Sequence, residues 1–362
     1  MAFGCAPRVA IGHRVGREFG LGLVALALAF LTFVAHGEEL LGERRNDGAA
    51  AAPIVHLVAL GSLEGQFEPC GCEPEPRGGL ARRAGALAQL RARGEPVLHL
   101  DLGNSSEVRG ESRDLTNRFI WDTLAHLHLD AAMVGERELE NWPAFAAWAE
   151  ASGVPLVSTN LFVAEKGQSR RAGVPSLIVE RGGLRFGLLG VLAPLPTATP
   201  LANELSFYVQ DPTEALRATL PSIQTQVDLV VLISQLSPAQ TEELSERVGG
   251  IDIALCGMAS NDERNSGQSR DRIPSSEKTI LQMAGKRGEY FGHLVLHVDD
   301  DGRILSFENK SPALDSRFPE DVGIAHRVGQ IRTTVDSLGA VEKRQEQDEF
   351  NALFERWRSA SK

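Results

Sequence analysis

Short apolar runs alternate with longer amphipathic stretches along most of the chain. The runs have the length and composition of buried strands; they are Ile54–Leu60, Val97–Leu102, Ala131–Val134, Leu156–Ser158, Leu184–Val191, Leu229–Ser234, Ile251–Cys256 and Thr279–Met283. The stretches between them carry apolar residues near helical spacing; they are Gly79–Arg93, Leu115–Leu127, Trp142–Ala151, Pro212–Gln226 and Pro238–Val248. Strands that alternate with helices predict an α/β domain with largely parallel sheets, and such sheets bind ligands beyond the carboxyl ends of their strands.

The pattern changes after the last of these runs. Gly292–Asp299 and Arg303–Asn309 alternate with the two-residue period of half-exposed strands, and the Asp-Asp-Gly segment at 300–302 predicts a hairpin turn between them. His293 and His297 lie on the first of these strands. At that spacing they are about 13 Å apart, too far to share one metal, so we expect both on a sheet surface.

The N-terminus has the pattern of a secretory signal peptide. Arginines precede an apolar run, Phe19–Ala35, and small residues follow it at the positions that a signal peptidase reads. The run is 17 residues long, which is short for a membrane span. Cleavage near Gly37 and export to the periplasm or the exterior are therefore favoured over an uncleaved membrane anchor.

The chain is expected to divide into four parts. Residues 1–37 form the signal peptide or anchor, and residues 38–53 form a charged, alanine-rich linker. Residues 54–312 form the α/β domain. Residues 313–362 form a helical extension, because the apolar residues between Val322 and Leu338 recur at helical spacing and predict one or two helices.

The charge of the chain excludes one class of function. The 37 basic and 48 acidic residues give a formal net charge of −11 at pH 7, whereas a protein that binds nucleic acid over its whole surface is basic. We therefore expect no nucleic-acid partner, and a membrane contact only if the N-terminal segment stays uncleaved. No Cys-x-x-Cys-His segment occurs, so covalently attached haem is excluded.

Two cysteines one residue apart form the most distinctive local motif. Cys70 and Cys72 lie in the segment Glu-Pro-Cys-Gly-Cys, in a loop rich in glycine and proline after the first strand. In an oxidising compartment such thiols close a small, strained disulfide, bind a soft metal such as zinc or copper, or remain inert. A metal needs further donors. The first candidates are Cys256, at the end of a later strand, and Glu136. The alternative role of Cys256 is that of a small core residue.

Seven short segments follow the strands in a recognisable order. They are Leu60–Gln66, Leu100–Asn104, Val134–Leu139, Leu156–Leu161, Leu232–Leu236, Leu255–Ser260 and Gly288–Leu294. In this order they resemble the loops of the calcineurin-like metallophosphoesterases, and among these the periplasmic 5′-nucleotidase branch. The resemblance covers about Ile54 to Asn309 and implies an α/β fold in which a two-sheet metallophosphoesterase-like sandwich is flanked by helices.

The positions that hold the metal ligands in that family carry other residues here. In chain order they are Ser62, Glu64, Asn104, Glu136, Arg137, Gln235, Met258 and Ser260. Asn104 stands where the family has the aspartate that bridges two metals, and Arg137 would place a positive charge beside them. A pair of divalent ions needs several anionic and imidazole ligands. The sequence therefore predicts the fold without the paired-metal site, with Glu64 and Glu136 at the surface or in salt bridges.

Three functions are compatible with these features. The first is a secreted pseudo-enzyme that keeps the phosphoesterase fold for a binding or accessory role. The second is an active phosphoester or nucleotide hydrolase with an altered metal site. The third is a thiol-based metal-binding or redox protein that uses Cys70 and Cys72.

Two further features bear on these alternatives. The Glu-Pro-Cys-Gly-Cys loop and the Gly-Gly-Leu-Ala-Arg-Arg segment at 78–83 are similar to those of a divergent branch of predicted secreted phosphoesterases. The stretch after Asn309 is too short for the C-terminal domain with which full 5′-nucleotidases grip the nucleoside. In the fold that the resemblance implies, Ser62, Asn104, Glu136, Gln235 and Gly257 are expected at neighbouring strand ends.

Overall fold

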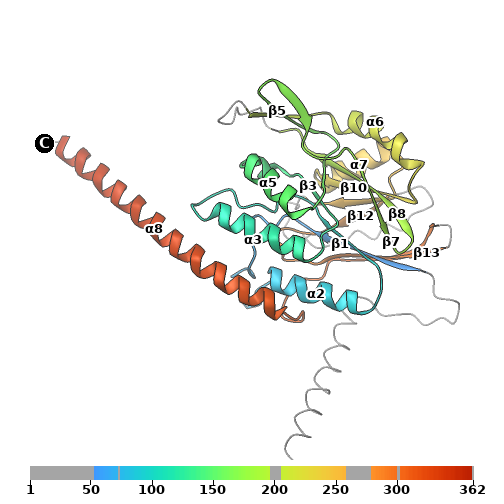
Figure 1. Ribbon diagram of the computed structural model, residues 1–362, viewed down its shortest axis with the longest axis horizontal. Helices are drawn as coiled ribbons and strands as arrows, with labels where there is room; N and C mark the ends of the chain where they lie inside the picture. Colours follow the sequence, from blue (N-terminus) through green and yellow to red (C-terminus); the bar gives the residue numbers. More distant parts are fainter. Residues whose placement is uncertain (1–52, 72–73, 196–204, 258–278, 300–301, 361–362) are drawn as a thin grey trace, which may run out of the picture. The chain divides into compact units, whose positions relative to one another are not determined.

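A six-stranded sheet contains the first strands of the chain and the predicted hairpin (Figure 1). The computed structural model describes residues 53–71, 74–195, 205–257, 279–299 and 302–360. The strand order is β14-β13-β1-β2-β3-β4. The parallel strands are β1 (Ile54–Leu60), β2 (Val97–Asp101), β3 (Ala131–Met133) and β4 (Leu156–Val157). The antiparallel strands at the β1 edge are β13 (Gly292–Val298) and β14 (Ile304–Lys310).

A second sheet of five strands has the order β12-β11-β10-β8-β7. Its parallel strands are β8 (Leu184–Leu192), β10 (Leu229–Gln235), β11 (Ile253–Cys256) and β12 (Ile280–Met283), and β7 (Leu177–Arg181) is antiparallel at one edge. Three short antiparallel strands form a separate sheet, namely β5 (Leu161–Glu165), β6 (Gln168–Arg171) and β9 (Leu205–Val209). Strands β5, β6, β7 and β9 were not predicted, because each contains exposed or half-exposed residues and none is a continuous buried run.

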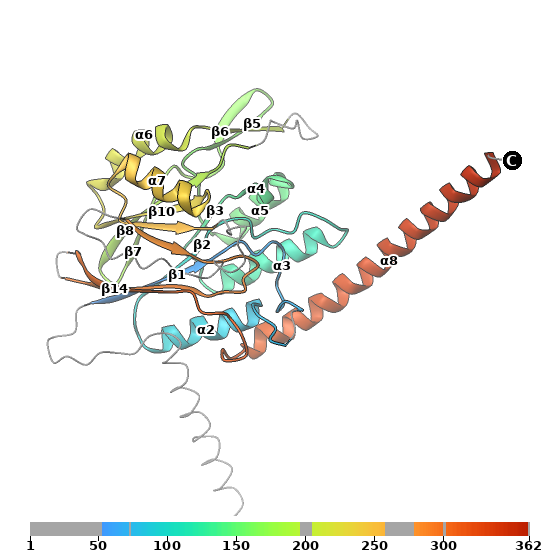
Figure 2. The ribbon, with the colours of Figure 1, turned by 180° about the vertical axis from the view of Figure 1, so that it is seen from behind.

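Helices cover the outer side of each main sheet. The helices that follow the first strands are α2 (Leu80–Ala92), α3 (Arg113–His126), α4 (Glu136–Leu139) and α5 (Trp142–Ser152). The second sheet is covered by α6 (Pro212–Gln224) and α7 (Pro238–Val248), whose apolar residues share one core cluster with β8, β10 and β11. Figure 2 shows α6 and α7 beside β8 and β10, with α2 on the opposite side near β14. The predicted two-sheet fold flanked by helices is confirmed.

One of the predictions for the hairpin is wrong. His293 is 0% exposed, although its strand alternates in sequence like a strand with one face in solvent. Both faces of β13 are buried, except at the half-buried His297. The strand lies inside the sheet between β1 and β14, and other parts of the protein cover both of its faces, including the one that carries His293.

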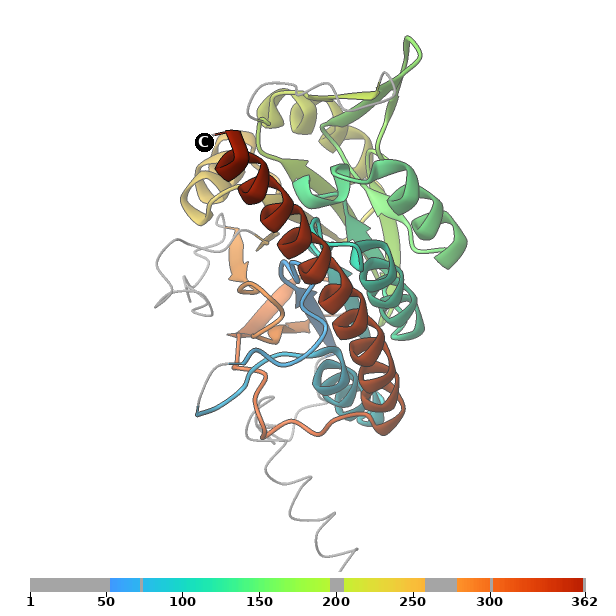
Figure 3. The same cartoon turned by 90° about the vertical axis from the view of Figure 1, so that its left-hand side faces the viewer.

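The C-terminal segment forms one helix, α8 (Val322–Ala360), where the sequence allowed one or two. Its first turns pack against α2 and α3, and Figure 3 shows them beside these helices. Ile324 and Val328 are buried in this contact. The guanidinium of Arg327 lies 5.6 Å from the ring centroid of Phe119 in α3. Farther along, Arg332 lies 3.6 Å from Glu68 in the cysteine loop.

A glycine inside α2 allows the segment before α8 to approach. A Cβ atom on Gly85 would overlap the carbonyl oxygen of Pro319, whereas Gly329 in α8 has open space around it. Replacing glycine by alanine inside a helix normally stabilises it by roughly 1 kcal/mol. We expect Gly85→Ala instead to lower the free energy of unfolding by about 1–3 kcal/mol through overpacking, and Gly329→Ala to leave it unchanged or raise it. Urea unfolding of both variants checks this, and equal effects would contradict the close approach.

Candidate functional site

The loops after β1, β2, β10 and β11 converge at the carboxyl ends of the two main sheets. The hydroxyl of Ser62 donates to the carbonyl oxygen of Gly257 at 2.9 Å. The side-chain amide of Asn104 donates to Oε1 of Gln235, also at 2.9 Å. Each of these bonds joins a loop of the first sheet to a loop or strand end of the second. The structure thus brings these four residues together, and it places Glu136, the fifth, in solvent at the start of α4.

Asn104 connects three segments through its side chain. Its Nδ2 donates to Gln235, and its Oδ1 accepts from the backbone N–H of Arg137 at 2.9 Å. The other end of the Gln235 amide donates to the carbonyl oxygen of Leu102. A Cβ atom on Gly135 would lie 2.5 Å from the backbone nitrogen of Asn104, so only glycine fits there. With these two contacts, the Nδ2 and Oδ1 atoms of Asn104 are both hydrogen-bonded to protein atoms.

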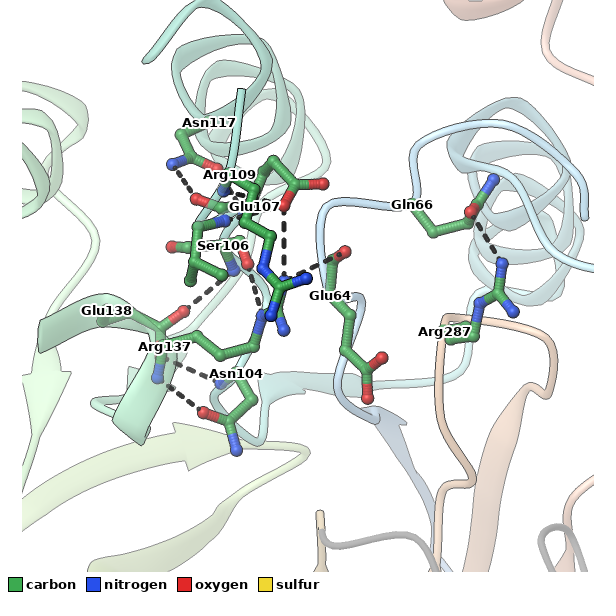
Figure 4. A network of polar contacts seen from close by, with 11 residues as sticks. Glu64, Gln66, Asn104, Ser106, Glu107, Arg109, Asn117, Arg137, Glu138 and Arg287 are labelled. Carbon is green, nitrogen blue, oxygen red and sulfur yellow. Dashed lines mark hydrogen bonds and ion pairs between the residues drawn. The ribbon is translucent and has the colours of Figure 1, made fainter. Parts of the chain in front are cut away.

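Arg137 lies between the loops after β1 and β2 (Figure 4). Its Nε donates to the carbonyl oxygen of Ser106 at 2.7 Å, and one terminal nitrogen lies 3.4 Å from the carbonyl oxygen of Glu64. The same nitrogen lies 3.6 Å from Oε1 of Glu107. Glu64 is half-buried, and its backbone N–H donates to the carbonyl oxygen of Asn104 at 3.0 Å. A guanidinium thus occupies the space between these loops.

The residue that holds the loops after β2 and β3 together is Glu138, which the sequence analysis did not single out. Its buried carboxylate accepts from the backbone N–H groups of Asn104 at 2.9 Å, Ser106 at 3.0 Å and Gly135 at 2.9 Å. Bonds from amides to an ionised carboxylate are stronger than neutral ones. The spacing of Glu138, three residues after a turn glycine that begins a helix, is the capping-box signal that could have identified it.

A second buried carboxylate lies at the end of β2. Asp101 accepts from the backbone N–H of Gly103 at 2.8 Å and from the hydroxyl of Ser105 at 2.5 Å. Burial raises its pKa to about 7, and the charge of Glu138 acts in the same direction. The buried Arg83 of α2 opposes this rise, and burial lowers the pKa of Arg83 itself to about 10. The bonds of Asp101 to Gly103 and Ser105 therefore also fix the loop that carries Asn104.

Backbone strain is concentrated at these loops. Among the described residues, Glu64, Asn104 and Arg287 belong to the small set of non-glycine residues with positive φ, at 53°, 60° and 55°. The backbone N–H of Arg287 donates to the carbonyl oxygen of Ser62, and its guanidinium donates to Oε1 of Gln66 at 3.2 Å. Such conformations cost of order 1 kcal/mol or more each and are found most often at functional sites.

The cysteines have different surroundings. Cys70 is buried on a short antiparallel bridge between Pro69 and Gly78, and its sulfur accepts from the N–H of Arg77 at 3.3 Å. Cys256 lies in the core cluster beneath α7, where its sulfur donates to the carbonyl oxygen of Leu236 at 3.2 Å. Cys72 lies outside the described residues, so the disulfide and the zinc or copper site stay predictions.

The residues at the family's metal positions do not match a pair of divalent cations. The described positions hold the hydroxyl of Ser62, the carboxylates of Glu64 and Glu136, the amides of Asn104 and Gln235 and the guanidinium of Arg137. Two metals require several anionic and imidazole ligands and a bridging carboxylate, whereas both amides bond to protein atoms. Within the described ranges no group of three or more His, Cys, Asp or Glu side chains could hold a metal. Met258 and Ser260 lie outside those ranges.

The relatives of the chain are metallophosphoesterases and nucleotide hydrolases. An uncharacterized metallophosphoesterase of Bacillus subtilis, YunD, is 27% identical over 194 residues, which are 52% of this chain and 39% of that protein. An apyrase of Tabanus yao is 23% identical over 297 residues, 74% of this chain and 51% of that protein. No family model matches. The chain thus spans about half or less of the length of these two relatives.

Solved structures confirm the fold. A 5′-nucleotidase precursor of Thermus thermophilus superposes with a TM-score of 0.63 at 20% identity, over 78% of this chain and 59% of that one. The sulfate thiohydrolase SoxB of the same genus superposes with a TM-score of 0.64 at 13% identity, over 81% and 62%. The predicted resemblance to the metallophosphoesterases and their 5′-nucleotidase branch is confirmed.

The role of Glu138 predicts that its substitution lowers the free energy of unfolding much more than the same substitution at Glu136. In Glu138→Gln one acceptor oxygen becomes an NH₂ group that faces backbone donors, and the charge is lost. We expect the free energy of unfolding to fall by about 2–3 kcal/mol. Glu136→Gln, at an exposed position one residue into the same short helix, should change it by less than about 0.5 kcal/mol. Chemical denaturation measures both, and a neutral Glu138→Gln would contradict the loop-tying role.

Asp101 predicts a pH dependence with a definite sign. Its pKa is about 7 in the folded protein and near 3.8 in the unfolded chain, so the folded state binds the extra proton between these values. The stability contribution of Asp101 therefore grows as the pH falls from 7 towards 4. The stability difference between the natural protein and Asp101→Asn should rise by about 2–3 kcal/mol in favour of the natural protein between pH 7.5 and pH 5. Denaturant titrations at these two pH values test it, and an unchanged or opposite difference would show that Asp101 is ionised throughout.

Proposed function

We propose that this divergent member of the metallophosphoesterase fold, in its 5′-nucleotidase branch, is a secreted pseudo-enzyme. It keeps the two-sheet scaffold and the loops around the former metal site, and it serves a binding or accessory role without paired-metal phosphatase chemistry. The alternative is a phosphoester or nucleotide hydrolase that works with an altered metal site, as the names of its relatives suggest.

The observation that carries the proposal is the hydrogen bonding of Asn104. The family's bridging aspartate has two negative oxygens that face two cations. Asn104 instead donates to Gln235 and accepts from the N–H of Arg137, so its polar atoms hold the loops together directly. The guanidinium of Arg137 adds positive charge in the space between the loops after β1 and β2. Hydrogen bonds between protein groups thus take the structural role that metals play in the active enzymes.

The strained backbone supports a binding role at the same loops. Glu64 and Asn104 keep positive φ values although glycine or a relaxed loop would cost less. The groups left accessible between them are half-buried or exposed and carry both signs of charge, namely Glu64, Arg137 and the exposed Glu136. A site of this composition suits a polar ligand that both accepts and donates hydrogen bonds.

Export is the part of the proposal that rests on the N-terminal sequence. The apolar run Phe19–Ala35 lies outside the described residues. In the part of the chain that the structure does describe, no helix is long and apolar enough to cross a bilayer. Relatives of the chain include venom 5′-nucleotidases of the snakes Crotalus adamanteus and Naja atra.

A hydrolysis assay combined with elemental analysis tests the proposal. Protein purified without added metal should contain no stoichiometric manganese, zinc or iron. With each of these metals added, it should hydrolyse p-nitrophenyl phosphate and AMP no faster than the matched blank. Asn104→Asp alone should not restore activity, because one carboxylate does not supply the missing imidazole ligands.

The control is an Asn104→Ala variant prepared in parallel. Metal-dependent hydrolysis that is present in the natural protein and abolished in Asn104→Ala would reject the pseudo-enzyme and establish the altered-site hydrolase. Hydrolysis that is equal in both preparations comes from a contaminating phosphatase and leaves the natural protein without activity of its own.

A further inference from the structure

Two buried histidines and a half-buried glutamate form a hydrogen-bonded chain at the first sheet. His56 of β1 and His293 of β13 are 2% and 0% exposed. Nδ1 of His56 lies 2.8 Å from Nε2 of His293, and Nε2 of His56 lies 2.7 Å from Oε2 of Glu95, in the loop between α2 and β2. The two rings are nearly parallel, with 13° between their planes. The chain thus links β13, β1 and the loop that leads into β2.

The hydrogen bonds assign the protons. The carboxylate of Glu95 can only accept, so Nε2 of His56 donates to it. Burial lowers the pKa of His56, and in the neutral ring Nδ1 is an acceptor whose donor is Nε2 of His293. Nδ1 of His293 keeps a lone pair that is buried and has no hydrogen-bond partner among the described residues. Both histidines are neutral in this arrangement, and one ring nitrogen is open to a proton.

The surroundings oppose protonation. Burial lowers the pKa of His293 well below its usual value, and the neighbouring His56, Arg93 and Lys310 lower it further. Burial also lowers the pKa of His56, with Glu95 acting in the opposite direction. The charged and titratable groups that face the pair from the surrounding elements are Arg93 at the end of α2, Glu95 in the next loop, His99 on β2, His297 on β13 and Lys310 on β14.

We propose that the His56–His293 pair is an acid-sensitive latch that holds the β13–β14 hairpin and the α2–β2 loop against β1. A proton taken from solution binds Nδ1 of His293 and makes the ring an imidazolium. The new N–H has no acceptor, and the charge lies among other positive groups in a buried contact. The contact of β13 with β1 therefore weakens in acid, whereas the second sheet, which lacks such a pair, is unaffected.

The sign of the pH dependence follows from the same geometry. In the unfolded chain His56 and His293 bind protons near pH 6.5, whereas in the folded protein this pair binds them only at lower pH. The stabilising contribution is complete above about pH 6.5 and is lost as the pH falls below it. Each proton taken up on unfolding raises the unfolding equilibrium constant by up to about tenfold per pH unit.

Urea unfolding of the full chain between pH 7.5 and pH 5.0 tests the latch. The variant is His293→Gln, whose amide can still donate to His56 but cannot take up the proton. The control is His126→Gln, at an exposed position in α3. We expect the pH slope of the unfolding constant to be shallower in His293→Gln than in the natural protein, by about tenfold per pH unit, and unchanged in His126→Gln. The opposing contribution of Asp101 is common to all three proteins and cancels.

Hydrogen–deuterium exchange locates the effect in the natural protein. After correction for the intrinsic pH dependence of exchange, amides of β13 and β14 should lose protection in acid before those of β10. Equal pH slopes in the natural protein and His293→Gln, or loss of protection in β10 first, would overturn the latch. If His293→Gln does not fold, the pH dependence of hydrogen–deuterium exchange at the ring C2–H of His293 is measured in the natural protein instead. Titration of this ring near pH 6.5 would contradict the proposal.

Discussion

Three backbone amides that donate to one buried carboxylate determine how the loops of this site meet. Glu138 accepts from Asn104, Ser106 and Gly135, so the loop after β2 and the turn after β3 share one anion. That contact places the Asn104 side chain within reach of Gln235 on β10 and thereby joins the two sheets. Without Glu138, three backbone donors would lose their acceptor, and the loop that carries Asn104 would lose its contact with the turn after β3.

Under the proposed function, the site keeps the shape of a metal centre while its chemistry has changed. A bridging carboxylate between two cations supplies strong attraction, but it requires the cations. An asparagine at the same place makes weaker bonds of fixed direction to groups that the chain itself provides. Arg137 supplies positive charge that the metals would otherwise bring. In the structure, hydrogen bonds between protein groups join these loops, and the proposed binding role falls to the residues between them.

The sequence predicted the parts of this structure that local pattern determines. Strands β1 and β10 are buried on both faces and read as continuous apolar runs, so their positions and the convergence of their loops could be inferred. Strands β5 and β7 carry exposed residues and gave no such run. His293 was placed at the surface because alternation along a strand does not reveal whether another part of the protein covers the second face.

The sequence predicted which residues lie at the candidate site, but it did not predict the hydrogen bonds between them. The order of the loops identified Ser62, Asn104 and Gln235 as neighbours. The partner of Asn104 lies 131 residues away in the chain, and no local pattern specifies that two amides will face one another. Glu138 was overlooked because a glutamate beside a glycine is common in sequences, although its capping position was visible.

The most direct measurement is anomalous X-ray diffraction from crystals grown with excess manganese. We expect no anomalous peak between the loops after β1, β2 and β10, and an intact hydrogen bond between Asn104 and Gln235. Two peaks a few ångströms apart at that place, with the Asn104 side chain turned towards them, would contradict it.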